Sequence, residues 1–163
     1  FTIFNFMNIK YVTINKLTEI DKLRFIKFVY DNTNSFILNT FGHTWSGRDW
    51  WSKYPIEACT DDKGKVLGLH AYTVNDKYED TLKTYYIVTS KDSRGQGIAK
   101  LLIKNAIFKH KDNIKFYYVN SDIKSEGAIF YKKWLGNNFT EEDNDFKSKD
   151  IIFKEPIYNI ING

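Results

Sequence analysis

The chain has 163 residues, of which 42% are hydrophobic and 17% aromatic, and its formal net charge is +4. This length and apolar content exclude a disordered chain and suffice for a domain with a buried core. A single cysteine, Cys59, excludes a disulfide scaffold and is typical of a reducing compartment; we expect it to be a small buried residue. The mild positive charge favours an acidic partner without identifying one.

We expect one domain over residues 1–163, because no repeat, low-complexity tract or linker divides the sequence. The only methionine is Met7, so residues 1–7 are interpreted as a possible leader. No apolar run approaches the roughly 20 residues that span a bilayer, and the N-terminus lacks the pattern of a secretion signal. These features predict a cytoplasmic protein that does not associate with membranes.

The first predicted elements are a strand over residues 8–15 and a helix over Glu19–Tyr30, which Thr18 can cap. Residues 35–54 contain three of the four tryptophans and two glycines, which indicates a short helix and an aromatic loop. Aromatic rings there fit two interpretations equally: they close the edge of the core, or they form the wall of a substrate pocket with a few polar groups. The candidate substrate-binding residues are His43, Trp45, Arg48, Trp50 and Trp51.

Three strands, Ile56–Thr60, Val66–Val74 and Thr81–Thr89, follow with short turns between them, which predicts an antiparallel meander. A helix is expected after Gly97, and its crossover makes the next strand, Ile114–Val119, parallel to the Thr81 strand. Ser125 can cap a helix that runs to Leu135. A final hairpin pairs residues 139–142 with 151–155, and Pro156 is expected to end the regular structure.

The stretch from Tyr85 to Ile103 passes from a strand through a glycine loop into a helix. Glycines allow a close approach of the backbone, and the first N–H groups of a helix attract negative charge, so this stretch predicts a phosphate site. The spacing is not that of a P-loop, because Ile98 and Ala99 follow Gly97, nor that of a dinucleotide turn, which needs glycine at Lys100. An ordinary strand-to-helix turn is the alternative interpretation.

The loop Arg94-Gly95-Gln96-Gly97-Ile98-Ala99 resembles the acyl-CoA loop of the GCN5-related N-acetyltransferases, Gln/Arg-x-x-Gly-x-Gly/Ala. Residues 128–136 resemble the Ala-Ile-x-x-Tyr-x-x-x-Gly-Phe helix of that family, and the predicted order of elements is similar from Asn8 onward. The resemblance implies an α+β (three-layer α/β) fold with a mixed central sheet of six to seven strands and flanking helices. It also implies transfer of acetyl from acetyl-CoA to a primary amine, on a small molecule or a peptide, by direct attack in a ternary complex.

The resemblance further implies roles for individual residues. Backbone groups of Ile87, Val88 and Thr89 would bind the pantetheine amides, the N–H groups of residues 94–99 the diphosphate, and Tyr131 would protonate the departing thiolate. A tyrosine packed in the core is the alternative for Tyr131. The chain departs from the family pattern at Lys124, where asparagine is usual, so Asn120 and Ser125 are the candidate replacements among the cofactor-binding residues.

The sequence leaves the general base open. Glu57 and His70 on neighbouring strands are the candidates, although a lone strand histidine is more often packed than catalytic. No metal site is predicted. The alternative function is a nucleic-acid-modifying or nucleic-acid-binding protein, with or without catalysis, that uses Lys100, Lys104 and Lys111 with the rings of Trp45–Trp51.

Overall fold

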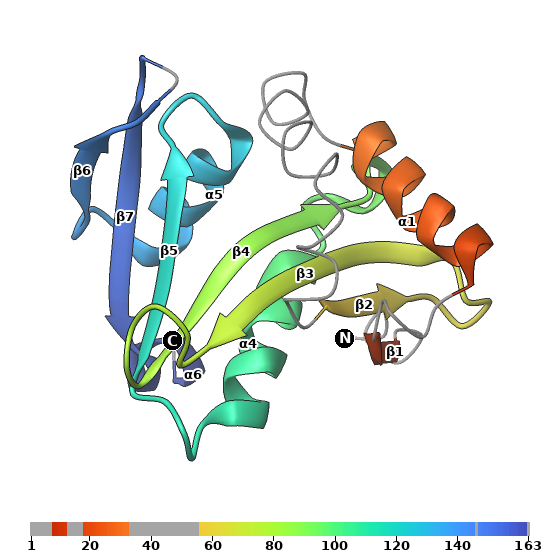
Figure 1. Cartoon of the computed structure of the whole chain (residues 1–163), viewed down its shortest axis with the longest axis horizontal. Coiled ribbons are helices and arrows are strands. Elements are labelled where there is room, and N and C mark those ends of the chain that lie inside the picture. Colours follow the sequence, from red (N-terminus) through yellow and green to blue (C-terminus); the bar gives the residue numbers. More distant parts are fainter. Residues whose placement is uncertain (1–7, 13–17, 33–55, 146, 163) are drawn as a thin grey trace. The chain divides into compact units, whose positions relative to one another are not determined.

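The computed structural model describes residues 8–12, 18–32, 56–145 and 147–162 (Figure 1). These residues belong to two compact units, Phe1–Thr73 with Tyr85–Ala106 (unit 1) and Val74–Thr84 with Ile107–Gly163 (unit 2). The prediction of one domain stays a prediction, and the possible leader lies outside the described residues. No helix in the described part of the chain is long and apolar enough to cross a membrane.

Unit 1 contains strands β1 (Asn8–Val12), β2 (Ile56–Thr60) and β3 (Val66–Val74) and the second half of β4 (Thr81–Thr89), in the sheet order β1-β2-β3-β4. Its helices are α1 (Glu19–Asn32), the short 3-10 helix η3 (Lys91–Ser93) and most of α4 (Ile98–His110). β2 is antiparallel to both β1 and β3, and its register with β3 shifts between Cys59 and Thr60. The predicted helix is present and extends two residues further, to Asn32.

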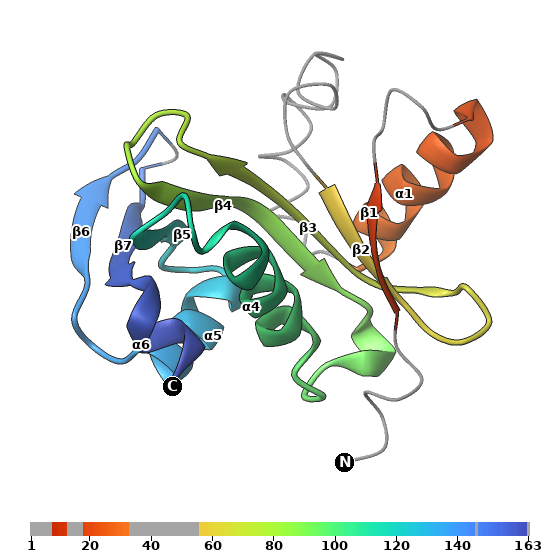
Figure 2. The same cartoon turned by 90° about the horizontal axis from the view of Figure 1, so that it is seen from below.

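Helices α1 and α4 pack on opposite faces of the unit 1 sheet, as Figure 2 shows. The reason is the alternation of side chains along the strands, which sends neighbouring residues to opposite faces. The core on the α1 face contains Val29, Ile56, Ala58, Leu69, Ala71, Tyr86 and Val88. The core on the α4 face contains Cys59, Ile98 and Leu102, and the burial of Cys59 agrees with the expectation from the sequence.

Gly68 on β3 allows α4 to approach the sheet closely. A Cβ atom at this position would lie 2.9 Å from Ile98 Cγ2, 3.0 Å from Leu102 Cδ1 and 3.3 Å from the Val88 carbonyl oxygen. Any side chain there would therefore force the Ile98 and Leu102 side chains, or the helix that carries them, to move. The absence of a side chain at Gly68 leaves room for Ile98 and Leu102 of α4 against the sheet.

Unit 2 contains the first half of β4, β5 (Phe116–Asp122), β6 (Thr140–Asp143) and β7 (Lys149–Pro156), in the order β4-β5-β7-β6. β4 pairs with β5 in parallel through Thr81–Lys83 and Phe116–Tyr118, as the predicted crossover requires, whereas β7 is antiparallel to β5 and β6. Among the described residues, the two units hold seven strands of a mixed sheet, and the predicted α+β fold is confirmed.

Helices α5 (Glu126–Leu135) and α6 (Ile157–Ile161) complete unit 2. The buried hydrophobic residues of unit 2 include Leu82, Tyr117, Val119, Ala128, Tyr131, Ile151, Phe153 and Ile160. The expectation that Pro156 ends the regular structure is wrong, because α6 begins directly after it. Proline lacks an N–H group that the first turn of a helix does not need, so it is compatible with a helix start.

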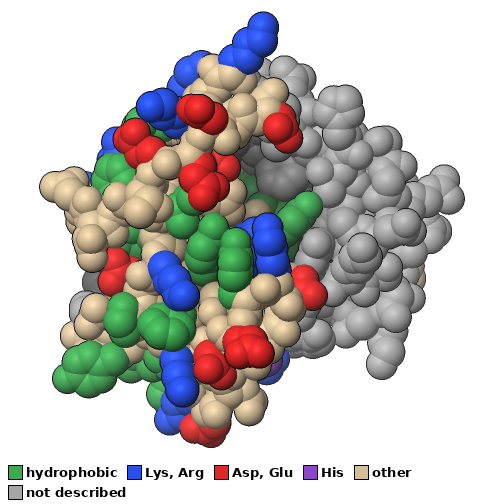
Figure 3. All heavy atoms as spheres, turned by 60° about the vertical axis from the view of Figure 1, so that its left-hand side comes forward, with side chains coloured by type: hydrophobic (Ala, Val, Ile, Leu, Met, Phe, Trp, Pro, Cys, Tyr) green, Lys and Arg blue, Asp and Glu red, His purple; other side chains and the backbone are tan. Residues whose placement is uncertain are grey.

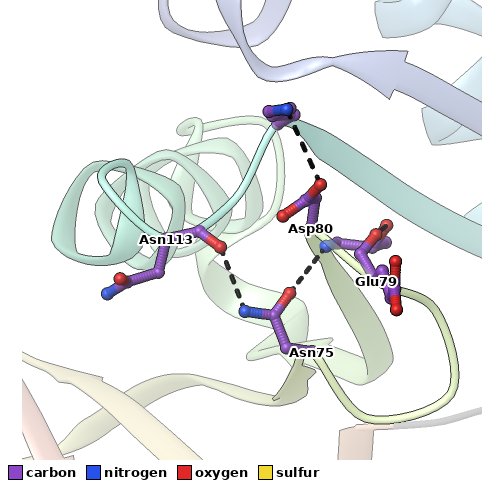
Figure 4. Close-up of polar contacts among 6 residues, drawn as sticks. Asn75, Glu79, Asp80 and Asn113 are labelled. Carbon is purple, nitrogen blue, oxygen red and sulfur yellow. Dashed lines mark hydrogen bonds and ion pairs between the residues drawn. The ribbon is translucent and has the colours of Figure 1, made fainter.

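A polar turn holds the beginning of β4 beside the beginning of β5 (Figure 4). Asn75, with φ of 53°, accepts a hydrogen bond from the Thr81 N–H at 3.0 Å and donates to the Asn113 carbonyl at 3.0 Å. The carbonyl of Asp80 accepts from the N–H groups of Lys115 and Phe116 at 2.6 and 2.9 Å. These bonds fix the register from which the parallel pair starts.

Candidate functional site

The glycine loop of unit 1 is held at its start by β3 and at its end by α4. The Ser90 N–H donates to the Leu67 carbonyl at 2.8 Å, and the Ser93 N–H donates to the Ser90 carbonyl at 3.0 Å. Gly95 and Gly97 follow with φ of 81° and 78°, a backbone conformation that strongly favours glycine. The Gly97 carbonyl then accepts the first intrahelical bond of α4, from the Leu101 N–H at 2.9 Å.

This geometry suits a bound anion. The N–H groups of Ile98 and Ala99 precede the first intrahelical donor of α4, so they have no acceptor within the helix. Gly95, Gln96 and Gly97 are exposed, and a Cβ atom at Gly95 would meet no other atom within 4 Å. An open loop, backbone donors and the positive end of a 13-residue helix together favour a diphosphate ligand.

Residues 87–89 form the end of β4, directly before the loop. Val88 is buried in the core on the α1 face, Ile87 packs against the core on the α4 face, and Thr89 is half-buried. With two of these three side chains packed in the cores, the polar groups that this strand end offers a ligand are mainly those of its backbone.

The two candidate bases lie opposite each other on β2 and β3, where Glu57 pairs with His70. The Glu57 side chain is 1% exposed and accepts hydrogen bonds from the Tyr72 hydroxyl at 2.6 Å and from Asn105 Nδ2 at 2.8 Å. Burial lowers the pKa of His70 to about 3, so its imidazole is neutral near pH 7. Tyr72 and Asn105 were not identified from the sequence, although the alternation along β3 places Tyr72 and His70 on one face.

Tyr131 lies on α5 in unit 2 and is 2% exposed. Its hydroxyl has no hydrogen-bond partner among the residues that the structure describes. The Tyr117 hydroxyl and Thr84 Oγ1 are 2.6 Å apart in the same core. Burial raises the pKa of Tyr131, and the hydroxyls of Tyr117 and Thr84 partly oppose that rise, so the phenol is protonated near neutral pH and is a weaker acid than an exposed tyrosine. Neither Tyr117 nor Thr84 was recognised from the sequence.

The two candidate replacements for the missing asparagine are both hydrogen-bonded within unit 2. Ser125 is the N-cap of α5: its Oγ accepts from the Ala128 N–H at 3.2 Å and donates to the Asp122 carbonyl at 2.7 Å. Asn120 is exposed, and its Nδ2 donates to Asp150 Oδ2 at 2.9 Å. Both side chains therefore hold local structure, whatever else they contact.

The proposed substrate-binding residues His43, Trp45, Arg48, Trp50 and Trp51 lie outside the described residues. Of the three lysines of the nucleic-acid alternative, Lys104 is half-buried, and Lys111 places Nζ 4.4 Å from the centre of the Phe108 ring. Figure 3 shows one face on which basic and acidic side chains are interspersed. Within the described ranges, no group of three or more His, Cys, Asp or Glu side chains is arranged to hold a metal ion.

Comparison with known proteins gives a consistent result. Residues 56–134 match the family model described as "Acetyltransferase (GNAT) domain". No curated protein sequence matches the chain significantly.

Several solved structures have a similar fold. The ribosomal-protein-S18-alanine N-acetyltransferase of Escherichia coli is 16% identical, with a TM-score of 0.62 over 93% of this chain and 94% of that one. A GNAT family acetyltransferase of Elizabethkingia anophelis with acetyl-CoA bound is 14% identical, with a TM-score of 0.62 over 92% and 97%. The PaiA N-acetyltransferase of Thermoplasma acidophilum in complex with coenzyme A is 11% identical, with a TM-score of 0.64 over 91% and 99%. At these identities the likeness is one of fold.

Proposed function

Because this chain belongs to the GCN5-related N-acetyltransferase superfamily, we propose that it transfers the acetyl group of acetyl-CoA to a primary amine by direct attack in a ternary complex. The observation that carries the proposal is the loop from Arg94 to Ala99, with its two left-handed glycines before the N-terminus of α4. The backbone of this loop supplies the donors for the diphosphate, and the backbone of Ile87–Thr89 supplies those for the pantetheine amides.

Bound acetyl-CoA supplies a thioester, and the reaction forms a C–N bond to the acceptor while the C–S bond breaks. Holding both reactants in line contributes on the order of 7–11 kcal/mol to catalysis, so positioning by the chain is the main requirement. Tyr131 donates its phenolic proton to the departing thiolate, for which a protonated phenol is suited.

The acceptor amine must lose a proton to attack, and Glu57 and His70 remain the proposed bases. The low pKa of His70 keeps its ring unprotonated near pH 7 and also makes it a weaker base than an exposed histidine. Both side chains are buried, so a chain of water molecules would have to carry the proton to them. The rings of Trp45, Trp50 and Trp51, with the polar side chains of His43 and Arg48, are proposed to bind the acceptor. Asn120 and Ser125 are proposed to contact the pantetheine.

The test is calorimetry with acetyl-CoA, for which we expect a dissociation constant in the micromolar range. Gly97→Glu places a carboxylate and a strained backbone in the loop and should abolish binding. The matched control is Gly64→Glu, because Gly64 also has a positive φ, 83°, and also lies in unit 1, in the turn between β2 and β3. The proposal fails if the unaltered protein does not bind acetyl-CoA, or if both variants bind it equally well.

A further inference from the structure

Asn32, the last residue of α1, forms hydrogen bonds with residues at the beginning of the glycine loop. Asn32 Oδ1 accepts a hydrogen bond from the Lys91 N–H at 2.9 Å, and the Asn32 carbonyl accepts one from Arg94 Nη2 at 2.5 Å. Its own Nδ2 donates to the Phe28 carbonyl at 2.8 Å. The third bond fixes the side-chain amide, so that Oδ1 is directed at Lys91.

Helix α1 is a firm support for these contacts. Val29 is fully buried, and Phe25 and Phe28 pack against the same core on β2 and β3. Phe28 thus both anchors the helix and accepts the hydrogen bond that orients Asn32. The loop is thereby connected to the sheet through α1 as well as through Ser90.

The loop needs such a support because of its composition. Residues 94–97 are exposed, and Gly95 and Gly97 lose more conformational freedom on ordering than any other residue type. Pre-ordering a loop reduces the entropy lost when a ligand binds. The bond from Arg94 also directs the guanidinium to the carbonyl end of α1, where the helix dipole favours a cation.

We propose that Asn32 is a positioning residue for the diphosphate of acetyl-CoA: it holds Lys91 in place, and with it the loop whose N–H groups bind the phosphates. This inference rests on the proposed function of the same loop. Asn32 acts through the loop backbone and makes no contact with the reacting atoms. Its effect should therefore depend on whether the acetyl donor carries a diphosphate.

The test compares acetyl-CoA with S-acetylpantetheine, which has the thioester but lacks the diphosphate and the nucleoside. Asn32→Ala should raise the KM for acetyl-CoA about three- to tenfold, the loss expected for one or two hydrogen bonds, and leave kcat unchanged. The KM for S-acetylpantetheine should change less than about twofold. Asn32→Asp keeps an oxygen for the Lys91 N–H but cannot donate to the Phe28 carbonyl, so it should restore only part of the affinity for acetyl-CoA.

Lys27→Ala is the control on the same helix, since it removes the exposed ion pair of Lys27 with Asp31. Asn32→Ser, whose side chain is too short to reach Lys91, is measured in parallel, so that one poorly folded variant does not decide the result. Equal changes in KM for both donors, or no change for either, would overturn the role of Asn32. Failure of the unaltered protein to bind acetyl-CoA would instead refute the proposed function.

Discussion

Replacing Gly68 with alanine should displace the N-terminus of α4 and thereby weaken cofactor binding from a position beneath the loop. The new Cβ would lie 2.9 Å from Ile98 Cγ2 and 3.3 Å from the Val88 carbonyl oxygen. The Ile98 side chain can rotate away from the new Cβ, whereas the Val88 carbonyl belongs to the backbone of β4 and can move less. Overpacking of this kind costs about 1–3 kcal/mol of unfolding free energy. For a chain of this size, that lowers the melting temperature by roughly 2–4 °C per kcal/mol.

Urea denaturation measures the loss of stability, and calorimetry with acetyl-CoA measures the displacement of the helix. Gly64→Ala is the control, because it introduces strain at a φ of 83° but meets no atom within 4 Å. It should lose stability without losing acetyl-CoA affinity. In a double-mutant cycle, Gly68→Ala should cost less in an Ile98→Ala background, where the closest contact is absent. Additive costs, or a Gly68→Ala variant with unchanged stability and affinity, would refute the steric argument.

Two further predictions concern buried titratable groups. Tyr131→Phe should lower kcat by about 10²-fold and leave the affinity for acetyl-CoA unchanged, since it removes a proton donor without removing a ring; an unchanged kcat would exclude Tyr131 as the acid. Burial holds the pKa of folded His70 at about 3, below its ordinary value of 6.5, so its stabilising contribution is complete above pH 6.5 and is lost as the pH falls toward 3. Between pH 6.5 and 5 the free energy of unfolding, measured by urea denaturation, should fall by about 2 kcal/mol. The His70→Gln variant should not show this fall.

The order and type of the described elements were largely predictable, because hydrophobic periodicity and turn residues are local signals. The boundaries were less so. At the end of α1, the Asn32 side chain accepts a hydrogen bond from the N–H group of Lys91, which is distant in the sequence. Strand β5 continues past Val119 to Asp122 because its last residues pair with Asp150–Ile152 of β7. Neither partner was available to an argument based on neighbouring residues in the sequence.

The residues of the candidate site likewise divide into those that the sequence reveals and those that only the structure reveals. Gly95 and Gly97 were recognisable because glycine is the residue that a positive φ requires, and the observed φ values agree. Gly68 and Asn32 were not recognisable, since their importance arises from contacts with Ile98 and Lys91, which are distant in sequence. Tyr117 and Thr84 likewise meet only once β4 and β5 have paired.

Because the proposed diphosphate site uses backbone N–H groups, it does not require one particular sequence. Diphosphate binding by N–H groups requires two left-handed positions and a helix that starts at a fixed height, and side chains are needed only to support that geometry. In this chain the support comes from Asn32 on α1 and from the missing side chain at Gly68 on β3. A related chain can meet the same requirement with other residues at those places, which is compatible with identities of 11–16% to the solved acetyltransferases.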